Sequence, residues 1–406
     1  MRNSHKTPFG WKRIKLGEYL AELSERNDTS GDNGTPVLSV TNRPGFSMSE
    51  EHFDKKVFSK DLSNYKIVQQ GQFAYNPSRV NVGSIARLKE FKKGLLSPMY
   101  IIFEAKGGLD GAYLDHWILS LRFRNLVKAS TQGSVRNSLN FSFLADFPFD
   151  LPPEHEQKQI ISVLDGIDSV IAQTQAVVNQ IEVVKKGLKR DLFVGGMPGK
   201  HKEFRKTSVG QIPKTWDVVR INDVGEIITG TTPSTKRPDY YGVACPWATP
   251  GDLGTEKYIQ VTKKYLSKKG LTVARAVPKG SILIVCIGST IGKVGIATQD
   301  MTTNQQINSI VCNDEWDYRY VFHLMDKLSS LFKLMAGRQA VPIISKKVLA
   351  AFYIPKPPKE EQELIGMSLD LMDENIIKEK EGISFLKHLK ASLAQALLTG
   401  EVRVKT

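Results

Sequence analysis

The chain has 406 residues, of which 41% are hydrophobic and 24% are charged, a composition typical of folded globular proteins and unlike that of disordered or collagen-like chains. No stretch approaches the roughly 18 consecutive apolar residues of a membrane span, and residues 1–6 lack the apolar core of a signal peptide, so we expect a cytoplasmic protein. The spacing of Cys245, Cys286 and Cys312 suits neither a disulfide framework nor a zinc site, and we expect free, packed thiols.

The formal net charge of +14 is unevenly distributed along the chain. Residues 1–150 hold 21 Lys/Arg against 15 Asp/Glu, and residues 201–355 hold 21 against 12. The segments that follow are nearly neutral, with 6 against 6 in residues 151–200 and 8 against 9 in residues 356–406. Two basic blocks of this size indicate domains that meet a polyanion, although a solvated surface of random charge is the alternative for either block alone.

The first basic block, residues 1–150, is predicted to be an α+β domain built from short elements. Apolar runs predict strands at residues 36–40 and 99–103, and a helical pattern covers residues 114–126. Loops at residues 75–84 and 131–137 carry small, amide and basic side chains.

Residues 151–196 are predicted to form a long connector helix. Pro152 and Pro153 block a helix before them, and the Glu/Gln-rich turn that follows suits a helix start. Apolar residues then recur in a 4-3-4-3 spacing, the seam of a coiled coil, until Gly195–Gly199 predicts a left-handed cap. The seam positions are Ile160, Leu164, Ile167, Ile171, Thr174, Val178, Ile181, Lys185, Leu188 and Leu192.

Residues 197–211 are predicted to be a polar linker into the second basic block, residues 212–355. This block also reads as an α+β domain, with a strand at residues 281–287 and a helix at 318–334. Its loops at residues 288–295 and 337–342 resemble the two loops of the first block in composition.

Residues 356–406 repeat the connector helix, which Gly400 is expected to end. Two helices of about 40 residues, each with one apolar stripe, predict an antiparallel coiled coil that closes the chain into a pseudo-twofold ring. The alternative is that each helix packs only on its own domain. The second seam runs through Ile365, Leu369, Met372, Ile376, Glu379, Ile383, Leu386, Lys390, Leu393 and Leu397, with polar residues at the same two steps.

An internal repeat at an offset of 205 residues explains why basic domains and nearly neutral connectors alternate along the chain. Between Pro152 and Gly195, 13 of 44 positions are identical to those 205 residues further on, where chance would give roughly 3. Each repeat is a domain plus a connector. The openings also correspond, as Pro8 and Trp11 fall on Pro213 and Trp216, and Leu151–Ile160 falls on Lys356–Ile365.

Over nearly the whole chain, these features resemble the specificity subunit of type I restriction-modification systems. The resemblance rests on a Pro-x-x-Trp opening, a variable domain, a Leu-Pro-Pro-x-x-Glu-Gln run at residues 151–157 and a long heptad helix, each given twice; Lys356 departs from the leucine of the second run. It implies two target-recognition domains that each read half of a bipartite DNA site. It also implies helices that act as spacer and docking surface for two methyltransferase subunits and usually two restriction (motor-nuclease) subunits. S-adenosylmethionine, ATP and Mg would then bind to those partners.

No motif predicts catalysis, a metal site or a cofactor site in this chain. The run Gly288–Val294 is one residue short of a phosphate-binding loop and ends without the required hydroxyl. Asn76–Arg79 lacks the second proline and the aromatic residue of an adenine methyltransferase motif. His155, His201 and His388 are expected on the surface. A nuclease built on scattered carboxylates stays open as an alternative.

Reading DNA requires amide or guanidinium groups that reach base edges, with basic side chains and backbone N–H groups on phosphates. The loops of both blocks offer such groups, although a structural or solvated role is the alternative for each residue taken singly. The candidate DNA-binding residues are Asn42, Arg43, Tyr75, Asn76, Ser78, Arg79, Asn81, Gln132, Arg136, Asn137, Thr249, Asp252, Ser289, Thr290, Lys293, Asn304, Gln305, Gln306, Arg338 and Gln339.

Two function classes remain. The favoured one is a non-catalytic, sequence-specific DNA recognition subunit, and the alternative is a scaffold or adaptor with duplicated protein- or RNA-binding domains. The seam register further predicts that Thr174 faces Ile383 and that Val178 faces Glu379. A fragment ending near Gly196 should therefore pair with a second copy of itself.

Overall fold

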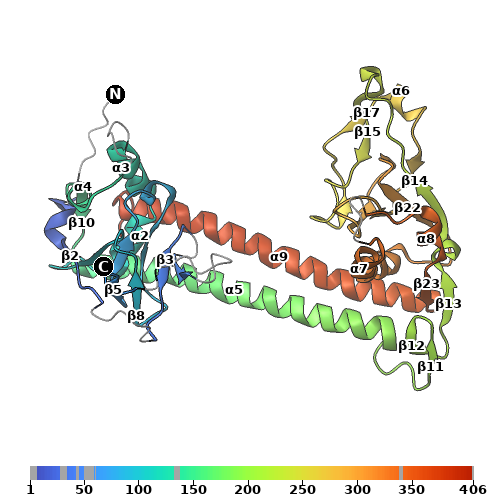
Figure 1. Cartoon of the computed structure of the whole chain (residues 1–406), viewed down its shortest axis with the longest axis horizontal. Coiled ribbons are helices and arrows are strands. Elements are labelled where there is room, and N and C mark those ends of the chain that lie inside the picture. Colours follow the sequence, from blue (N-terminus) through green and yellow to red (C-terminus); the bar gives the residue numbers. More distant parts are fainter. Residues whose placement is uncertain are drawn as a thin grey trace. The chain divides into compact units, whose positions relative to one another are not determined.

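The computed structural model describes residues 7–27, 34–42, 45–49, 59, 61–131, 138–337 and 342–404. The chain divides into two compact units. Unit 1 combines residues 1–175 with residues 381–406, whereas unit 2 is the continuous stretch 176–380. Figure 1 shows accordingly that the end of the last helix lies beside the N-terminal domain.

Unit 1 contains an α+β domain whose largest sheet has the antiparallel strand order β2-β9-β6-β7. Its core is aromatic: the ring of Trp117 meets those of Phe149 and Phe123 edge-on, with centroids 4.9 and 5.3 Å apart. The strands are β1 Lys12–Lys15, β2 Leu20–Leu23, β3 Leu38–Val40, β4 Phe46–Met48, β5 Lys66–Gln69, β6 Phe73–Tyr75, β7 Ile85–Arg87, β8 Lys93–Leu96, β9 Ile101–Ala105 and β10 Pro148–Leu151, and the helices are α2 Gly111–Ile118, α3 Leu121–Thr131 and α4 Phe141–Ala145.

The single helix predicted over residues 114–126 is in fact two helices, α2 and α3. The break has a local cause, because the Ser120 hydroxyl accepts a hydrogen bond from the Phe123 N–H at 3.2 Å. A serine that satisfies a free N–H group in this way starts a new helix. The predicted strands at residues 36–40 and 99–103 are present as β3, which starts two residues later than predicted, and β9, which is shifted by two residues.

Unit 2 contains a second α+β domain, with a five-stranded sheet of order β14-β22-β19-β20-β16 and a four-stranded sheet of order β17-β15-β21-β18. The predicted strand and helix of this block are confirmed as β19 and α7. The strands are β13 Asp217–Arg220, β14 Gly225–Thr229, β15 Tyr241–Ala248, β16 Tyr258–Ile259, β17 Tyr265–Leu266, β18 Ala276–Val277, β19 Ile282–Val285, β20 Val294–Ala297, β21 Met301–Thr303, β22 Ile307–Cys312 and β23 Tyr353–Lys356, and the helices are α6 Lys268–Leu271, α7 Tyr318–Met335 and α8 Lys346–Ala351.

The predicted polar linker contains regular structure. Strands β11 (Phe204–Thr207) and β12 (Gly210–Pro213) form an antiparallel hairpin. Gly210 adopts a positive φ of 105°, a conformation that favours glycine. The Arg205 guanidinium donates a hydrogen bond to the carbonyl of Trp216 at 2.5 Å, which ties the hairpin to the opening of the second domain.

The three cysteines are free, as expected, with Cys245 and Cys286 buried and Cys312 half-buried. Burial raises the pKa of the Cys286 thiol to about 11 and that of Cys312 to about 12. At about pH 8 we therefore expect a thiol reagent to label both very slowly in the folded protein and readily after unfolding. Mass spectrometry before and after denaturation measures this difference, and rapid labelling of Cys286 in the native protein would contradict the packing described.

Helices α5 (Glu154–Gly195) and α9 (Lys359–Leu398) form the predicted antiparallel pair within each unit (Figure 1). Each of the twenty predicted seam positions is buried or half-buried. In unit 1 Lys390 bonds Asp168 at 2.5 Å, and in unit 2 Lys380 bonds Glu182 at 2.7 Å, so residue numbers fall along α9 as they rise along α5. The alternative in which each helix packs only on its own domain is wrong. The specific pairing of Thr174 with Ile383 stays a prediction.

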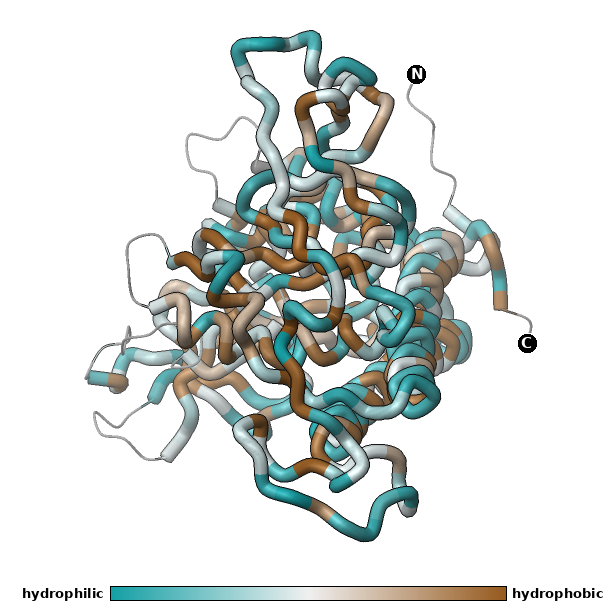
Figure 2. Tube along the Cα trace, turned by 90° about the vertical axis from the view of Figure 1, so that its right-hand side faces the viewer, coloured by the Kyte–Doolittle hydropathy of each residue, from teal (hydrophilic) through white to brown (hydrophobic). Residues whose placement is uncertain are grey.

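The repeat is visible in how each domain meets its connector. In unit 1 strand β1 pairs antiparallel with β10, which leads into α5, and in unit 2 β13 pairs with β23, which leads into α9. The predicted caps are present, because Gly196 and Gly400 have φ values of 73° and 69°. Hydrophobic residues gather inside the domains, and hydrophilic ones follow much of the protruding loops (Figure 2). Among the described residues, no helix is both long and apolar enough to cross a membrane.

Candidate nucleic-acid interface

In unit 1, several candidate DNA-binding residues share the turn between β6 and β7. Ser78, Arg79 and Asn81 are exposed there. Asn42, also exposed, lies against this turn, because a Cβ on Gly83 would come within 2.4 Å of its Oδ1. Asn42 and Arg79 line one cleft of about 680 Å³. The structure thus brings together an amide and a guanidinium that are distant in sequence.

Two candidates in the same stretch have structural roles. Tyr75 is fully buried, with its ring edge-on to Phe103 at 6.1 Å, so it packs the core and presents no ring to a ligand. Burial raises the pKa of its hydroxyl. Asn76 is 8% exposed, and its Oδ1 accepts the Ser78 N–H at 3.0 Å. It shapes the turn that carries Ser78 and Arg79.

In unit 2, Asp252 is committed to a loop. Its carboxylate accepts the N–H and the hydroxyl of Thr249 at 2.8 and 2.7 Å, and the N–H of Lys263 at 2.9 Å. These bonds occupy both carboxylate oxygens. Thr249 and Asp252 therefore hold the loop closed. The side chain of Lys263, whose N–H is bound by Asp252, is exposed.

A second group in unit 2 surrounds the turn between β21 and β22. Asn304 donates to Gln306 Oε1 at 2.9 Å, and Gln306 in turn donates to the Ile287 carbonyl at 3.3 Å. This links the turn to the loop after β19, which carries Ser289, Thr290 and Lys293. Exposed side chains here are Gln305, which accepts a hydrogen bond from Thr232, and Ser289. Thr290 and Lys293 are half-buried.

The remaining candidates lie outside the described residues. They are Arg43, Gln132, Arg136, Asn137, Arg338 and Gln339.

The Glu-Gln pair of each connector anchors the opening of its own domain. Glu156 accepts the indole N–H of Trp11 at 2.9 Å, and Glu361 accepts that of Trp216 at 3.1 Å. The two glutamates are 3% and 0% exposed. This arrangement explains why the Pro-x-x-Trp opening and the Pro-Pro-x-x-Glu-Gln run occur together in both repeats.

Each anchor is completed by the end of the opposite helix. Arg403, just after α9, binds both oxygens of Glu156 at 2.6 and 2.7 Å, and His201, after α5, donates to Glu361 at 2.8 Å. The prediction of a surface position for His201 is wrong, because its side chain is 6% exposed. His155 and His388 are exposed, as predicted.

The glutamine of each pair ties the connector to the first helix packed on it. Gln157 accepts the Asp110 N–H at 2.8 Å, and Gln362 accepts the Asp317 N–H at 3.0 Å. Both aspartates are N-caps, Asp110 of α2 and Asp317 of α7. The second repeat therefore places α7 where the first places α2.

Two buried histidines were missed by the sequence reasoning. His116 on α2 and His323 on α7 each bond an aspartate of a connector helix, at 2.8 and 2.7 Å. A second aspartate three residues further along the connector completes each cluster, whose three ligand-type atoms lie within 4.8 Å of one another. The signal was an Asp-x-x-Tyr-x-x-His run at residues 110–116 and 317–323, which recurs at an offset of 207 instead of 205.

Comparison with known proteins agrees with this architecture. The family model described as the type I restriction modification DNA specificity domain matches residues 33–183 and 213–384. The MjaVIII specificity subunit of a type I restriction enzyme from Methanocaldococcus jannaschii is 29% identical over 98% of this chain and 95% of its own length. The MjaIX specificity subunit from the same organism is 34% identical over 47% of this chain and 45% of its own length.

Solved structures share the fold. The S subunit from M. genitalium superposes with a TM-score of 0.58 at 12% identity, covering 98% of this chain and 97% of that one. The HsdS subunit from Thermoanaerobacter tengcongensis gives 0.51 at 19% identity, covering 98% and 99%. Since the family model spans most of both repeats, the chain belongs to the family of type I restriction-modification specificity subunits, which recognise DNA and are not themselves enzymes.

Proposed function

We propose that this chain recognises a bipartite, asymmetric DNA site and directs methyltransferase and restriction subunits to it. The observation that carries the proposal is the duplicated anchor, in which Trp11–Glu156 and Trp216–Glu361 mount two separate basic domains on one pair of helices. The mounts are alike, but the exposed loops differ: Ser78, Arg79 and Asn81 in one domain have no counterpart of the same sequence in the other. Two domains that are anchored in the same way but carry different exposed loops support recognition of two different half-sites.

The outer face of α5 supports docking of partner subunits. Val163, Val170, Val177 and Val184 recur at every seventh position and are 38%, 46%, 48% and 48% exposed. A heptad of apolar residues outside the seam is suited to further helices packed alongside. We infer two methyltransferase subunits and two restriction subunits as the partners, with S-adenosylmethionine, ATP and Mg²⁺ bound by them and the complex acting on DNA in the cytoplasm.

Selection from a random DNA library tests the proposal. The full chain should enrich two unlike sequence elements at one fixed separation, and its affinity for them should fall linearly as the logarithm of salt concentration rises. Arg79→Ala should weaken binding about tenfold, and should lower the salt slope by about 1 if Arg79 contacts a phosphate. If it contacts a base, preference at one position should relax instead.

Arg190→Ala is the matched control, because Arg190 is an exposed arginine on α5 and its loss changes the net charge equally. This variant should bind as the wild type does. Equal effects of both variants, or affinity for RNA that exceeds affinity for DNA, would favour the scaffold alternative.

A further inference from the structure

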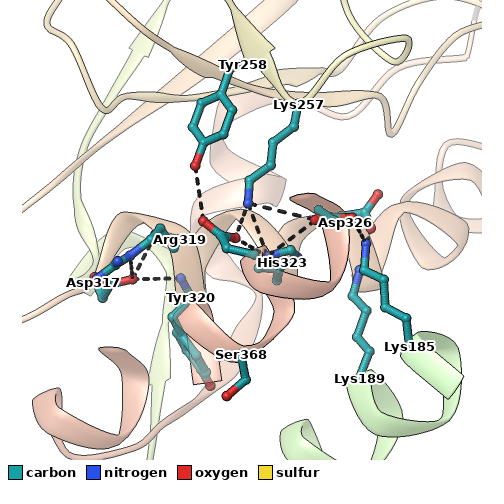
Figure 3. A network of polar contacts seen from close by, with 12 residues as sticks. Lys185, Lys189, Lys257, Tyr258, Asp317, Arg319, Tyr320, His323, Asp326 and Ser368 are labelled. Carbon is teal, nitrogen blue, oxygen red and sulfur yellow. Dashed lines mark hydrogen bonds and ion pairs between the residues drawn. The ribbon is translucent and has the colours of Figure 1, made fainter. Parts of the chain in front are cut away.

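A polar cluster joins three helices in unit 2. His323 on α7 donates from Nε2 to Asp370 on α9 at 2.7 Å, and Asp373, one turn further on α9, pairs with Lys185 on α5. Lys257, just before β16, also pairs with Asp370. Figure 3 shows the lysines converging on this network from different elements, with His323 at its centre.

Unit 1 contains the equivalent cluster. His116 on α2 bonds Asp165 on α5 at 2.8 Å, and Asp168, one turn further, bonds Lys390 on α9 at 2.5 Å. The aspartates and the lysines are each related by the 205-residue repeat, with Lys185 and Lys390 being the polar steps of the two seams. Each cluster thus contains a domain helix, the connector of the same repeat and the connector of the other repeat.

The charges within the unit 2 cluster are balanced without an added cation. Burial alone would raise the pKa of Asp370, but the hydrogen bonds from His323 and Lys257 and the positive charge of Lys257 outweigh it and lower the pKa to about 2. Burial lowers the pKa of His323, which keeps the imidazole neutral. Two lysine ammonium groups, on Lys185 and Lys257, already occupy the carboxylates that a metal ion would need.

Directional bonds of this kind select one register of the helices more strictly than an apolar seam does. Leucine and isoleucine side chains permit sliding and rotation at low cost, whereas a buried hydrogen-bonded ion pair within a seam selects one register. The His323 side chain is fully buried, and its Nδ1 has no hydrogen-bond partner among the described residues, so Nε2 alone sets the orientation of the ring. The bond between His323 and Asp370 therefore helps to fix the position of α7 on α9, together with the bond from the Asp317 N–H to Gln362.

We propose that the two clusters are orientation joints and that their members are positioning residues for DNA recognition. Each joint fixes the angle at which a recognition domain is mounted on the α5–α9 pair. Because both helices continue from one unit into the other, these two angles set the separation between DNA half-sites that the protein accepts. This inference rests on the proposed bipartite recognition.

Unit 2 offers a matched pair of variants. Lys185 and Lys380 both bridge α5 and α9, but the Lys185–Asp373 side chains are 21% and 22% exposed, whereas those of Lys380–Glu182 are 52% and 48% exposed. Lys185→Met should loosen the joint, and Lys380→Met removes a solvated ion pair of little energetic weight. Asp373→Asn should act like Lys185→Met, and Lys185→Arg should preserve the wild-type behaviour.

The readout is binding of the full chain to its two half-sites with the gap between them changed by one base pair in either direction. The wild type should prefer one gap by about tenfold or more, on the order of the penalty for a mismatched base pair. Lys185→Met and Asp373→Asn should reduce that preference severalfold while leaving the preferred half-site sequences unchanged. Lys380→Met and Lys185→Arg should keep the wild-type preference.

Several results would contradict the proposal that the clusters orient the recognition domains. One is a preference for a single gap length that is as strong in Lys185→Met as in Lys380→Met. Another is thermal stabilisation of the wild type by Mn²⁺ or Zn²⁺ that His323→Gln abolishes, which would identify the cluster as a cation site. If Lys185→Met fails to fold, Lys390→Met in unit 1 repeats the test. A wild type that binds DNA without any preferred gap would instead refute bipartite recognition itself.

Discussion

Replacing Glu361 by alanine should destabilise unit 2 by about 3–5 kcal/mol, the typical cost of leaving buried polar partners uncompensated. The carboxylate is fully buried and accepts three hydrogen bonds, from the Trp216 indole, the His201 ring and the Met197 N–H. Alanine would leave all three donors without an acceptor. Chemical denaturation followed by tryptophan fluorescence measures the loss, and the exposed neighbour Glu360→Ala should change stability by less than about 0.5 kcal/mol.

The same carboxylate gives stability a pH dependence of definite sign. Burial alone would raise the pKa of Glu361, but hydrogen bonds from Met197, His201 and Trp216 outweigh it and hold the pKa below its usual value of 4.5. The contribution of ionised Glu361 to the stability of the folded protein is therefore complete above about pH 4.5 and is lost as the pH falls through the lowered pKa. Denaturation curves of Glu361→Ala should depend less on pH in this acidic range. An unchanged profile would show that Glu361 is not the charged acceptor described.

Arg403→Ala should destabilise unit 1 by about 2 kcal/mol. This is less than the cost of breaking a fully buried ion pair, because water can partly replace the guanidinium. Arg403 makes two hydrogen bonds to Glu156 and one to the Phe9 carbonyl at 2.7 Å, and its guanidinium lies 5.8 Å from the Trp11 ring centroid. Its loss would leave the buried Glu156 with the hydrogen bond from the Trp11 indole but without its guanidinium partner, and would detach the C-terminal segment from the first domain. Hydrogen exchange near Trp11 reports that detachment directly.

Arg403→Lys separates charge from geometry. Lysine keeps the positive charge but cannot form the two parallel bonds of the guanidinium, so this variant should recover part of the stability. Glu401→Ala, two residues away and exposed, should behave like the wild type. Faster exchange near Trp216 than near Trp11 in Arg403→Ala would contradict the assignment of this segment to unit 1.

The helical framework could be predicted because its signals are local and periodic. Pro152 and Pro153 mark the start of α5, and the repeat of apolar residues from Ile160 to Leu192 defines the face that is buried. The polar steps at Lys185 and Lys390 were visible as irregularities of the seam. Their aspartate partners were not identified, because the seam pattern predicts which seam positions face each other but not which flanking carboxylate a long lysine side chain reaches.

Side-chain roles inside the domains were harder to predict, since they depend on contacts between distant segments. Tyr75 is an aromatic residue of the kind that can stack on a base, yet it lies at the end of a strand with its ring against Phe103. Trp11 and Glu156 are 145 residues apart, and no pattern links them except their joint recurrence in the second repeat. The histidine clusters were hidden because the two domains, although equal in length from tryptophan to Pro-Pro, place the run differently: Asp110 lies 99 residues after Trp11, whereas Asp317 lies 101 residues after Trp216, which moves His323 out of alignment with His116.

The division of the chain has a consequence for its biosynthesis. Unit 2 is the continuous stretch 176–380, so the ribosome delivers all of it in one piece, whereas unit 1 needs residues 381–406, which are translated after both domains. Domains generally fold as they emerge from the ribosome. Here the domain translated first is completed last, and until Leu397 and Leu398 arrive, the apolar surface around Ile160 and Leu164 that they help to cover stays open. A nascent chain stalled before these residues would therefore present its N-terminal domain, not its C-terminal one, to chaperones.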